Sequence, residues 1–238
     1  MRIFLTRALP AAAIVIAAGL GGFFAYGLVS KPDMVVASAS APATVESTTA
    51  RATASDHVAP QAQKIPDALP DVAFTDRLGV TRRLSDWKGH PLLVNFWAAW
   101  CLPCRDEIPL LERLSRERAR QGLRVIGIAV DSRAAVLDYA RQAAIRYPLL
   151  IGEQPGLELV RALGMEAVFP FSVFVDARGQ IVTLKIGELR TDQAALILDR
   201  LDDLDRGRID LDTARREISA GMAKLAVARA RNTTDGGS

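Results

Sequence analysis

The only two cysteines of the 238-residue chain stand in one segment, Trp100-Cys101-Leu102-Pro103-Cys104. An apolar run from Leu92 to Trp97 precedes it and predicts a buried strand, and the residues after it have helical periodicity. A Cys-x-x-Cys pair between a strand and a helix is typical of a reactive dithiol. The free N–H groups and the dipole at a helix N-terminus stabilise a thiolate. The sequence therefore predicts redox chemistry at Cys101 and Cys104.

Two structural cysteines, or a permanent disulfide, are the alternative interpretation of this pair. Two cysteines are too few for a disulfide-stapled scaffold, and a structural zinc site needs about four ligands. The two histidines, His57 and His90, stand alone in the sequence. We therefore expect a redox dithiol with no metal and no other cofactor.

The charge of the chain is nearly balanced, with 30 Lys and Arg against 27 Asp and Glu. No dense basic patch with interleaved aromatic residues appears, so we expect no nucleic-acid partner. Half of the residues are apolar, which is enough to build a core.

The N-terminal segment is almost wholly apolar from Ala8 to Val29, about the length that a membrane-spanning helix needs. Arg2 and Arg7 precede it, so the positive-inside rule places the N-terminus in the cytoplasm. We predict an uncleaved single-pass anchor at residues 1–30. The alternative is a signal peptide cleaved after Ala37-Ser38-Ala39, although that site lies far beyond the apolar run. Either interpretation exports the rest of the chain.

Composition divides the remaining chain into three parts. Residues 31–69 are rich in Ala, Ser, Thr and Pro and predict a flexible linker. Residues 70–205 carry the alternating patterns of a folded domain. Residues 206–238 predict a helical extension with a tail that is disordered from Asn232. The apolar face of this extension is expected to pack on its own domain, and a docking element is the alternative.

The domain shows strand and helix patterns in alternation. A hairpin is expected over residues 72–84, with further strands at 92–97, 123–130, 147–151, 171–176 and 180–186. Helices are expected at 101–120, 134–145, 156–163 and 191–204. This order predicts an α/β fold with a mixed sheet.

These elements resemble the thioredoxin fold, and within it the membrane-anchored, extracytoplasmic TlpA, ResA and CcmG group of thiol-disulfide oxidoreductases. The matching segments are Asn95 to Pro109, Val125 to Asp131, Pro170 to Asp176, and Gly179. The resemblance covers about Pro70 to Leu204. It implies a thioredoxin-like domain with a mixed central sheet flanked by helices, preceded by an N-terminal transmembrane helix.

The two cysteines have different expected roles. Cys101 begins the helix near solvent and is the expected attacking thiolate. Cys104 lies one turn further and is the expected resolving thiol, which closes the Cys101–Cys104 disulfide. Leu102 and Pro103 are expected to set the reduction potential. They offer no histidine of the kind that strongly oxidising thioredoxin-like proteins often carry, which favours a reductant.

Glu107 stands three residues after Cys104, on the same helix face. A solvated carboxylate is the ordinary interpretation. The resemblance places a functional glutamate here, which would raise the thiol pKa values by charge repulsion and relay a proton. Asn95 occupies the place where thioredoxin carries a buried acid, so Glu107 is the expected group for proton transfer.

Three further residues are expected to meet the substrate. By resemblance, Pro170 is a cis-proline that faces the dithiol, and Phe169 before it offers backbone groups to an extended peptide. Trp100 lines the same groove or packs in the core. Asp131, at a strand end, is expected to cap the following helix, and facing the active site is the alternative.

The resemblance implies a reductase of disulfides in exported proteins, held on the periplasmic side of a bacterial inner membrane. Its implied partners are a transmembrane electron donor of the DsbD or CcdA type and, as substrate, apocytochrome c or a copper-delivery protein. A Cu(I) metallochaperone that uses both thiolates is an alternative. A non-catalytic docking module is another. A peroxiredoxin-like peroxidase is disfavoured by the cysteine spacing.

Overall fold

The apolar run before the cysteines forms strand β3 (Leu92–Trp97), whose residues are all buried. Burial on both faces is what a central strand covered by helices requires. β3 pairs in parallel with β4 (Arg124–Ala129) and antiparallel with β6 (Phe171–Val175). The predicted mixed sheet is therefore confirmed around its central strand.

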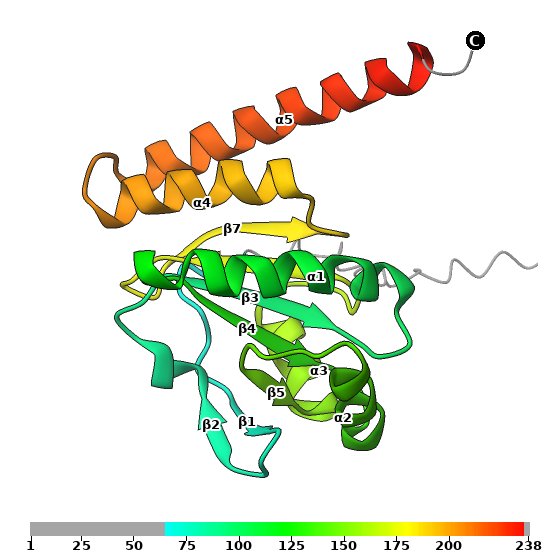
Figure 1. Ribbon diagram of the computed structural model, residues 1–238. Coiled ribbons are helices and arrows are strands. Elements are labelled where there is room, and N and C mark those ends of the chain that lie inside the picture. Colours follow the sequence, from blue (N-terminus) through cyan, green and yellow to red (C-terminus); the bar gives the residue numbers. More distant parts are fainter. Residues whose placement is uncertain (1–64, 236–238) are drawn as a thin grey trace, which may run out of the picture. The chain divides into compact units, whose positions relative to one another are not determined.

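The structure is a computed structural model that describes residues 65–235 (Figure 1). Its seven strands form one sheet in the order β2-β1-β5-β4-β3-β6-β7. The remaining strands are β1 (Ala73–Asp76), β2 (Thr81–Arg83), β5 (Leu149–Ile151) and β7 (Ile181–Ile186). The anchor predicted at residues 1–30 lies outside the described residues. Within residues 65–235, no helix has the length and apolar character needed to cross a membrane.

Helices cover both faces of the sheet. They are α1 (Leu102–Glu117), α2 (Arg133–Gln142), α3 (Glu153–Ala162), α4 (Thr191–Asp205) and α5 (Leu211–Asp235), with short 3₁₀ turns at Leu84–Trp87 and Ala119–Gln121. One core lies under α1, α2, α4 and α5, and a second lies under α3. The thioredoxin-like arrangement of a mixed sheet between helices is confirmed.

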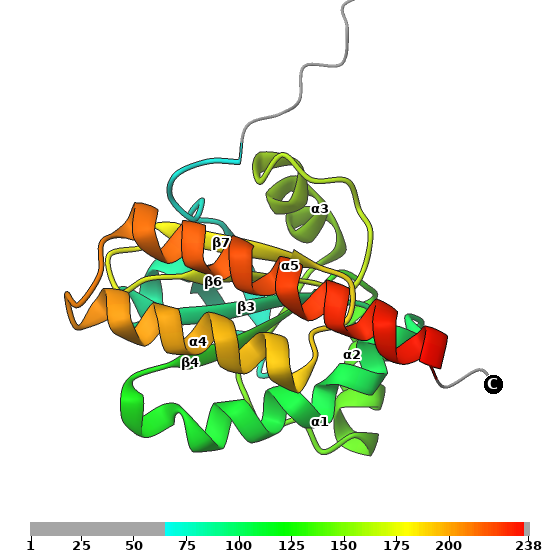
Figure 2. The same cartoon turned by 90° about the horizontal axis from the view of Figure 1, so that it is seen from above.

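The C-terminal extension packs on its own domain. α5 lies beside α4 in Figure 2, with Ala214 and Ile218 buried in the shared core. Gly221 allows this close approach, because a Cβ there would lie 2.6 Å from a methyl of Leu196. The disorder predicted from Asn232 is wrong for residues 232–235, which continue the helix. An established helix extends at little cost, because each added residue gains a hydrogen bond.

Several predicted element boundaries differ from the structure by one to three residues. The first long helix ends at Glu117 instead of residue 120, and the 3₁₀ turn after it closes at Gly122 with a φ of 93°. Glycine adopts this left-handed conformation without strain. The folded chain also begins before residue 70, because Ala68 forms a bridge with Gln180. That single bridge has no hydrophobic pattern by which the sequence could have revealed it.

Candidate active site

The two cysteines form a disulfide at the start of α1, with an S–S distance of 1.99 Å. Cys101 is the N-cap of the helix, and its sulfur accepts a hydrogen bond from the Cys104 N–H at 3.3 Å. Leu102 and Pro103 occupy the first helical turn between them. When the disulfide is reduced, a sulfur in this place meets the free N–H groups and positive dipole end that favour a thiolate.

Solvent access separates the two sulfurs. Cys101 keeps 5% of its surface exposed and Cys104 keeps none, so only Cys101 offers a route to a partner. We expected Cys101 to lie near solvent, and it is more exposed than Cys104 but still largely buried. The flanking Trp100 and Leu102 are 66% and 68% exposed, so apolar side chains stand in solvent on both sides of the disulfide.

Glu107 lies one turn beyond Cys104 and is buried, so the interpretation of it as a solvated carboxylate is wrong. Its Oε1 accepts a 2.6 Å hydrogen bond from Asn95 Nδ2, and its Oε2 accepts a 2.8 Å bond from the Leu189 N–H. Burial raises the pKa of Glu107 to about 7, although both hydrogen bonds oppose this rise. The side chain can therefore take up and release a proton near neutral pH.

Asn95 connects Glu107 to the sheet. It lies on β3 with its side chain toward α1, and its Nδ2 also donates to Ser172 Oγ at 3.1 Å. Ser172 faces Asn95 across the β3–β6 pair. We did not predict Ser172 as part of the site. The signal was present, since it is the one polar residue of the apolar strand Phe171–Val175.

The Phe169–Pro170 peptide bond is cis, as the resemblance implied. Pro170 leads directly into β6, at the sheet end where β3 runs toward the cysteines. The Trp100 and Phe169 rings meet edge to face, with centroids 6.2 Å apart. Because Trp100 is largely exposed, the core interpretation of this residue is wrong. The predicted substrate-binding residues therefore gather beside the disulfide.

Asp131 supports the segment before the dithiol. Its Oδ2 accepts a 2.9 Å hydrogen bond from the Ala99 N–H, and its Oδ1 accepts one from the Ser132 N–H at 2.6 Å. The predicted capping role is wrong, because Ser132 is the N-cap of α2. Arg105 was not predicted either, and its Nε donates to the Ala99 carbonyl at 2.7 Å. Ala99 is therefore held at both its N–H and its carbonyl, two residues before Cys101.

Comparison with known proteins places this site in a wider context. Residues 65–184 match the AhpC/TSA family. The thiol-disulfide oxidoreductase ResA of Bacillus thuringiensis (strain Al Hakam) is 30% identical over 125 residues, which are 52% of this chain and 70% of ResA. The thioredoxin-like protein YneN of Bacillus subtilis (strain 168) is 31% identical over 124 residues, 50% of this chain and 70% of YneN.

Solved structures agree with these sequence matches. A secreted thiol-disulfide isomerase from Corynebacterium glutamicum shares 26% identity and a TM-score of 0.52, over 57% of this chain and 85% of its own. A Chlorobium tepidum protein provisionally assigned as the thiol:disulfide interchange protein DsbE shares 25% identity and a TM-score of 0.52, over 58% of this chain and 98% of its own. Helix α5 begins after the last residue of the family match.

Proposed function

The chain belongs to the AhpC/TSA family as a TlpA/ResA/CcmG-like thiol-disulfide oxidoreductase, and from this premise we propose that it reduces disulfides in exported proteins. One observation carries the proposal: Cys101 caps α1 and is the only residue of the pair with exposed surface. A reduced Cys101 is thus a stabilised nucleophile that a partner disulfide can reach.

The first step is attack of the Cys101 thiolate on one sulfur of the partner disulfide. A new S–S bond joins Cys101 to the partner, the partner's own S–S bond breaks, and its second sulfur leaves as a thiolate. Phe169 and Pro170 border the site, so the backbone of an extended partner segment can pair beside the reacting sulfurs.

The second step releases the partner. Cys104 loses its proton and attacks Cys101, which restores the Cys101–Cys104 disulfide and frees the partner's remaining thiolate. Two electrons thus pass from this chain to the partner. Cys104 is fully buried, so water does not take up its proton directly. Glu107 lies one helical turn away with a pKa of about 7 and is the group that accepts this proton.

The setting of the reaction belongs to the same proposal. The apolar segment Ala8 to Val29 supports a single-pass anchor in a bacterial inner membrane, with the domain in the periplasm. An oxidising compartment requires that the spent disulfide be reduced again, and a transmembrane donor of the DsbD or CcdA type would supply the electrons. Apocytochrome c or a copper-delivery protein is the proposed substrate.

Trapping tests the proposal directly. With Cys104→Ser, the second step cannot occur, and mixed disulfides on Cys101 should accumulate on exported proteins. Cys101→Ser is the matched control and should trap none. If Cys104→Ser captures no partner and the wild type leaves a model protein disulfide intact, the reductase proposal is wrong. Stoichiometric Cu(I) uptake by the reduced protein would then favour the metallochaperone alternative.

The reduction potential tests the direction of electron flow. A reductase of this kind should have a potential well below about −200 mV, whereas a strong oxidant lies near −120 mV. Equilibration of the purified domain with glutathione at several ratios gives the value. A potential near the oxidant end would contradict the reductase direction and leave the oxidoreductase activity in place.

A further inference from the structure

Lys185 lies near the end of β7, where its side chain folds back onto the backbone that follows it. Its Nζ donates to the carbonyls of Gly187 and Glu188, each at 3.1 Å, and to the carbonyl of Ile186. A lysine ammonium has three N–H donors, so these three consecutive carbonyls use all of them. The side chain is half-buried and therefore partly shielded from competing water.

The segment held by Lys185 touches two parts of the redox site. The Gly187 N–H donates to the Pro170 carbonyl at 2.8 Å, and Gly187 adopts a φ of 77°, which suits glycine. Two residues later, the Leu189 N–H donates to Glu107 Oε2 at 2.8 Å. The turn from Ile186 to Leu189 thus connects the cis-proline to the buried carboxylate.

The sheet register places the lysine on the Glu107 side. Lys185 stands opposite Ser172, and Ser172 stands opposite Asn95. Residues opposite each other on neighbouring strands share one face, so a polar row of Lys185, Ser172 and Asn95 runs beneath the carboxylate. The positive charge of Lys185 lowers the pKa of Glu107 and partly offsets the effect of burial.

We propose that Lys185 is a positioning residue of the redox site, which fixes the turn from Ile186 to Leu189 and sets the charge balance around Glu107. This inference rests on the proposed role of Glu107 as proton acceptor for Cys104. Through its three carbonyl contacts, the lysine keeps the Leu189 N–H aimed at the carboxylate. Its charge keeps a fraction of Glu107 ionised, and therefore able to accept a proton, at neutral pH.

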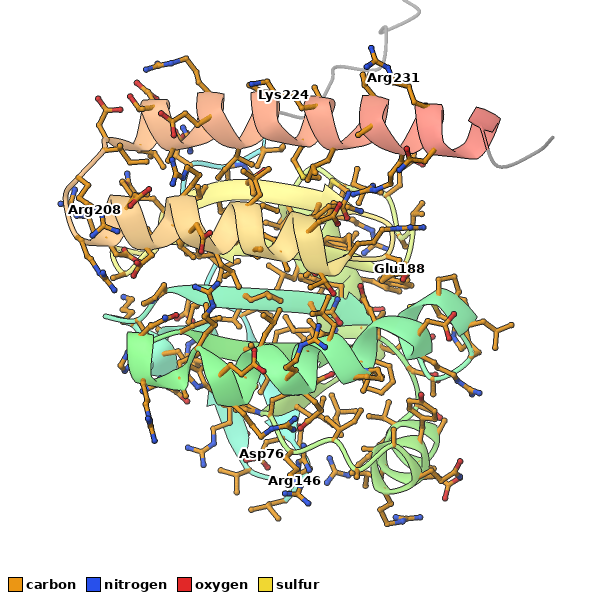
Figure 3. The ribbon with its side chains drawn as sticks, turned by 45° about the horizontal axis from the view of Figure 1, so that its top comes forward. Asp76, Arg146, Glu188, Arg208, Lys224 and Arg231 are labelled. Carbon is orange, nitrogen blue, oxygen red and sulfur yellow. A yellow bond between two sulfur atoms is a disulfide. The ribbon has the colours of Figure 1, made fainter. Side chains whose placement is uncertain are left out.

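Other charged groups act on the same pair. Glu188, labelled in Figure 3 at the turn before α4, raises the pKa of Glu107. Desolvation lowers the pKa of Lys185, and Arg229 of α5 and Arg190 lower it further, whereas Glu107 and Glu188 raise it. Arg229 is itself paired with Asp192 at 2.9 Å. Among these groups, Lys185 is the one whose ammonium hydrogen-bonds to the carbonyls of the turn from Ile186 to Leu189. Its removal therefore changes both the geometry of the turn and the charge near Glu107.

Lys185→Met tests the proposal, because it keeps an unbranched side chain and removes the ammonium. The midpoint of Glu107, followed by carboxyl NMR of the oxidised protein, should rise by about one pH unit. The acidic limb of the Cys104 resolving rate, where the rate rises as Glu107 ionises, should move upward by the same amount. Lys185→Arg retains the charge and should stay near the wild type. Lys224→Met is the matched control, since it removes an exposed lysine on the outer side of α5 (Figure 3).

The outcomes separate this inference from the proposed function. An unshifted Glu107 midpoint in a folded Lys185→Met variant overturns the role of Lys185, while a wild type that reduces disulfides still supports the reductase. Equal shifts in Lys185→Met and Lys224→Met also overturn it, because the effect would then be one of net charge. A wild type inactive at every pH contradicts the reductase alone, since the midpoint is measured on the oxidised protein without a substrate.

Discussion

Helix α1 carries two buried glutamates with different surroundings, Glu107 near the dithiol and Glu112 further along. Glu112 Oε1 accepts hydrogen bonds from the Arg146 and Tyr147 N–H groups at 2.6 and 3.3 Å, and its Oε2 pairs with Arg116 at 3.3 Å. A guanidinium and two backbone amides thus satisfy its carboxylate. Glu112 fastens α1 to the segment before β5.

The carboxylate of Glu107 is stabilised by fewer donors than that of Glu112, and none of them is charged. It receives one backbone amide and one side-chain amide, and among residues 65–235 no Lys, Arg or His side chain forms an ion pair with it. Desolvation then dominates and raises the pKa of Glu107 to about 7. The two glutamates are thus both buried but differ in the number and charge of the donors that reach their carboxyl groups.

The largest expected difference between Glu107 and Glu112 is in how each affects the pH dependence of stability. The pKa of Glu107 is about 7 in the folded protein against an ordinary 4.5, so the folded state binds more protons between these values. The contribution of Glu107 to the free energy of unfolding should therefore be fully present below about pH 4.5 and be lost, a fall of ~3 kcal/mol, as the pH rises through 7. Urea unfolding of the oxidised protein at pH 5 and pH 8 measures this fall.

Glu107→Gln should remove most of this fall, whereas Glu112→Gln should keep it. The two substitutions remove the same charge from the same helix, so each is the control for the other. An equal pH dependence in wild type and Glu107→Gln would show that Glu107 does not titrate with a raised pKa.

The next effect is kinetic. Glu107→Gln should slow the release of a trapped mixed disulfide by Cys104 about 10²-fold near neutral pH, because no nearby base then accepts the thiol proton. Stopped-flow measurement of the resolving step gives the rate. Glu112→Gln should leave this rate within about twofold of wild type. A slow resolving step in both variants would mean that altered packing of α1 is the cause.

A smaller effect is expected for the structural glutamate. Glu112→Ala should lower the free energy of unfolding by about 2 kcal/mol, since it leaves the Arg146 and Tyr147 amides without an acceptor. The reduction potential of the dithiol should stay at its wild-type value. A shifted potential would show that the support of α1 reaches the cysteines and would weaken the contrast between the two glutamates.

The smallest effect concerns Asp131, a half-buried carboxylate outside α1. Asp131→Asn should cost about 1 kcal/mol of stability, because the bond to the Ala99 N–H loses its charge. Since Ala99 lies two residues before Cys101, the reactivity of Cys101 with iodoacetamide should also change slightly. Unaltered stability and unaltered alkylation would show that the Arg105 contact alone holds this segment.

The sequence allowed the dithiol, the central strands and the helices to be predicted, because each depends on local periodicity. Cys101 and Cys104 needed only their spacing and the strand before them. Glu107 could be proposed only through resemblance, since one of its hydrogen-bond donors, the Leu189 N–H, lies 82 positions further along the chain. The role of Asp131 depends on Ala99 and that of Lys185 depends on Glu107, each in another segment of the chain. No periodicity encodes such contacts, so their geometry became visible only in the folded chain.

The bridge between Ala68 and Gln180 determines where the preceding chain joins the domain. Gln180 precedes the start of β7, and Ile186 at its other end lies on the dithiol side, so the length of the strand, roughly 20 Å, separates the two. A force applied to the chain before Ala68 would therefore reach the domain at the turn before β7, about one strand length away from the cysteines.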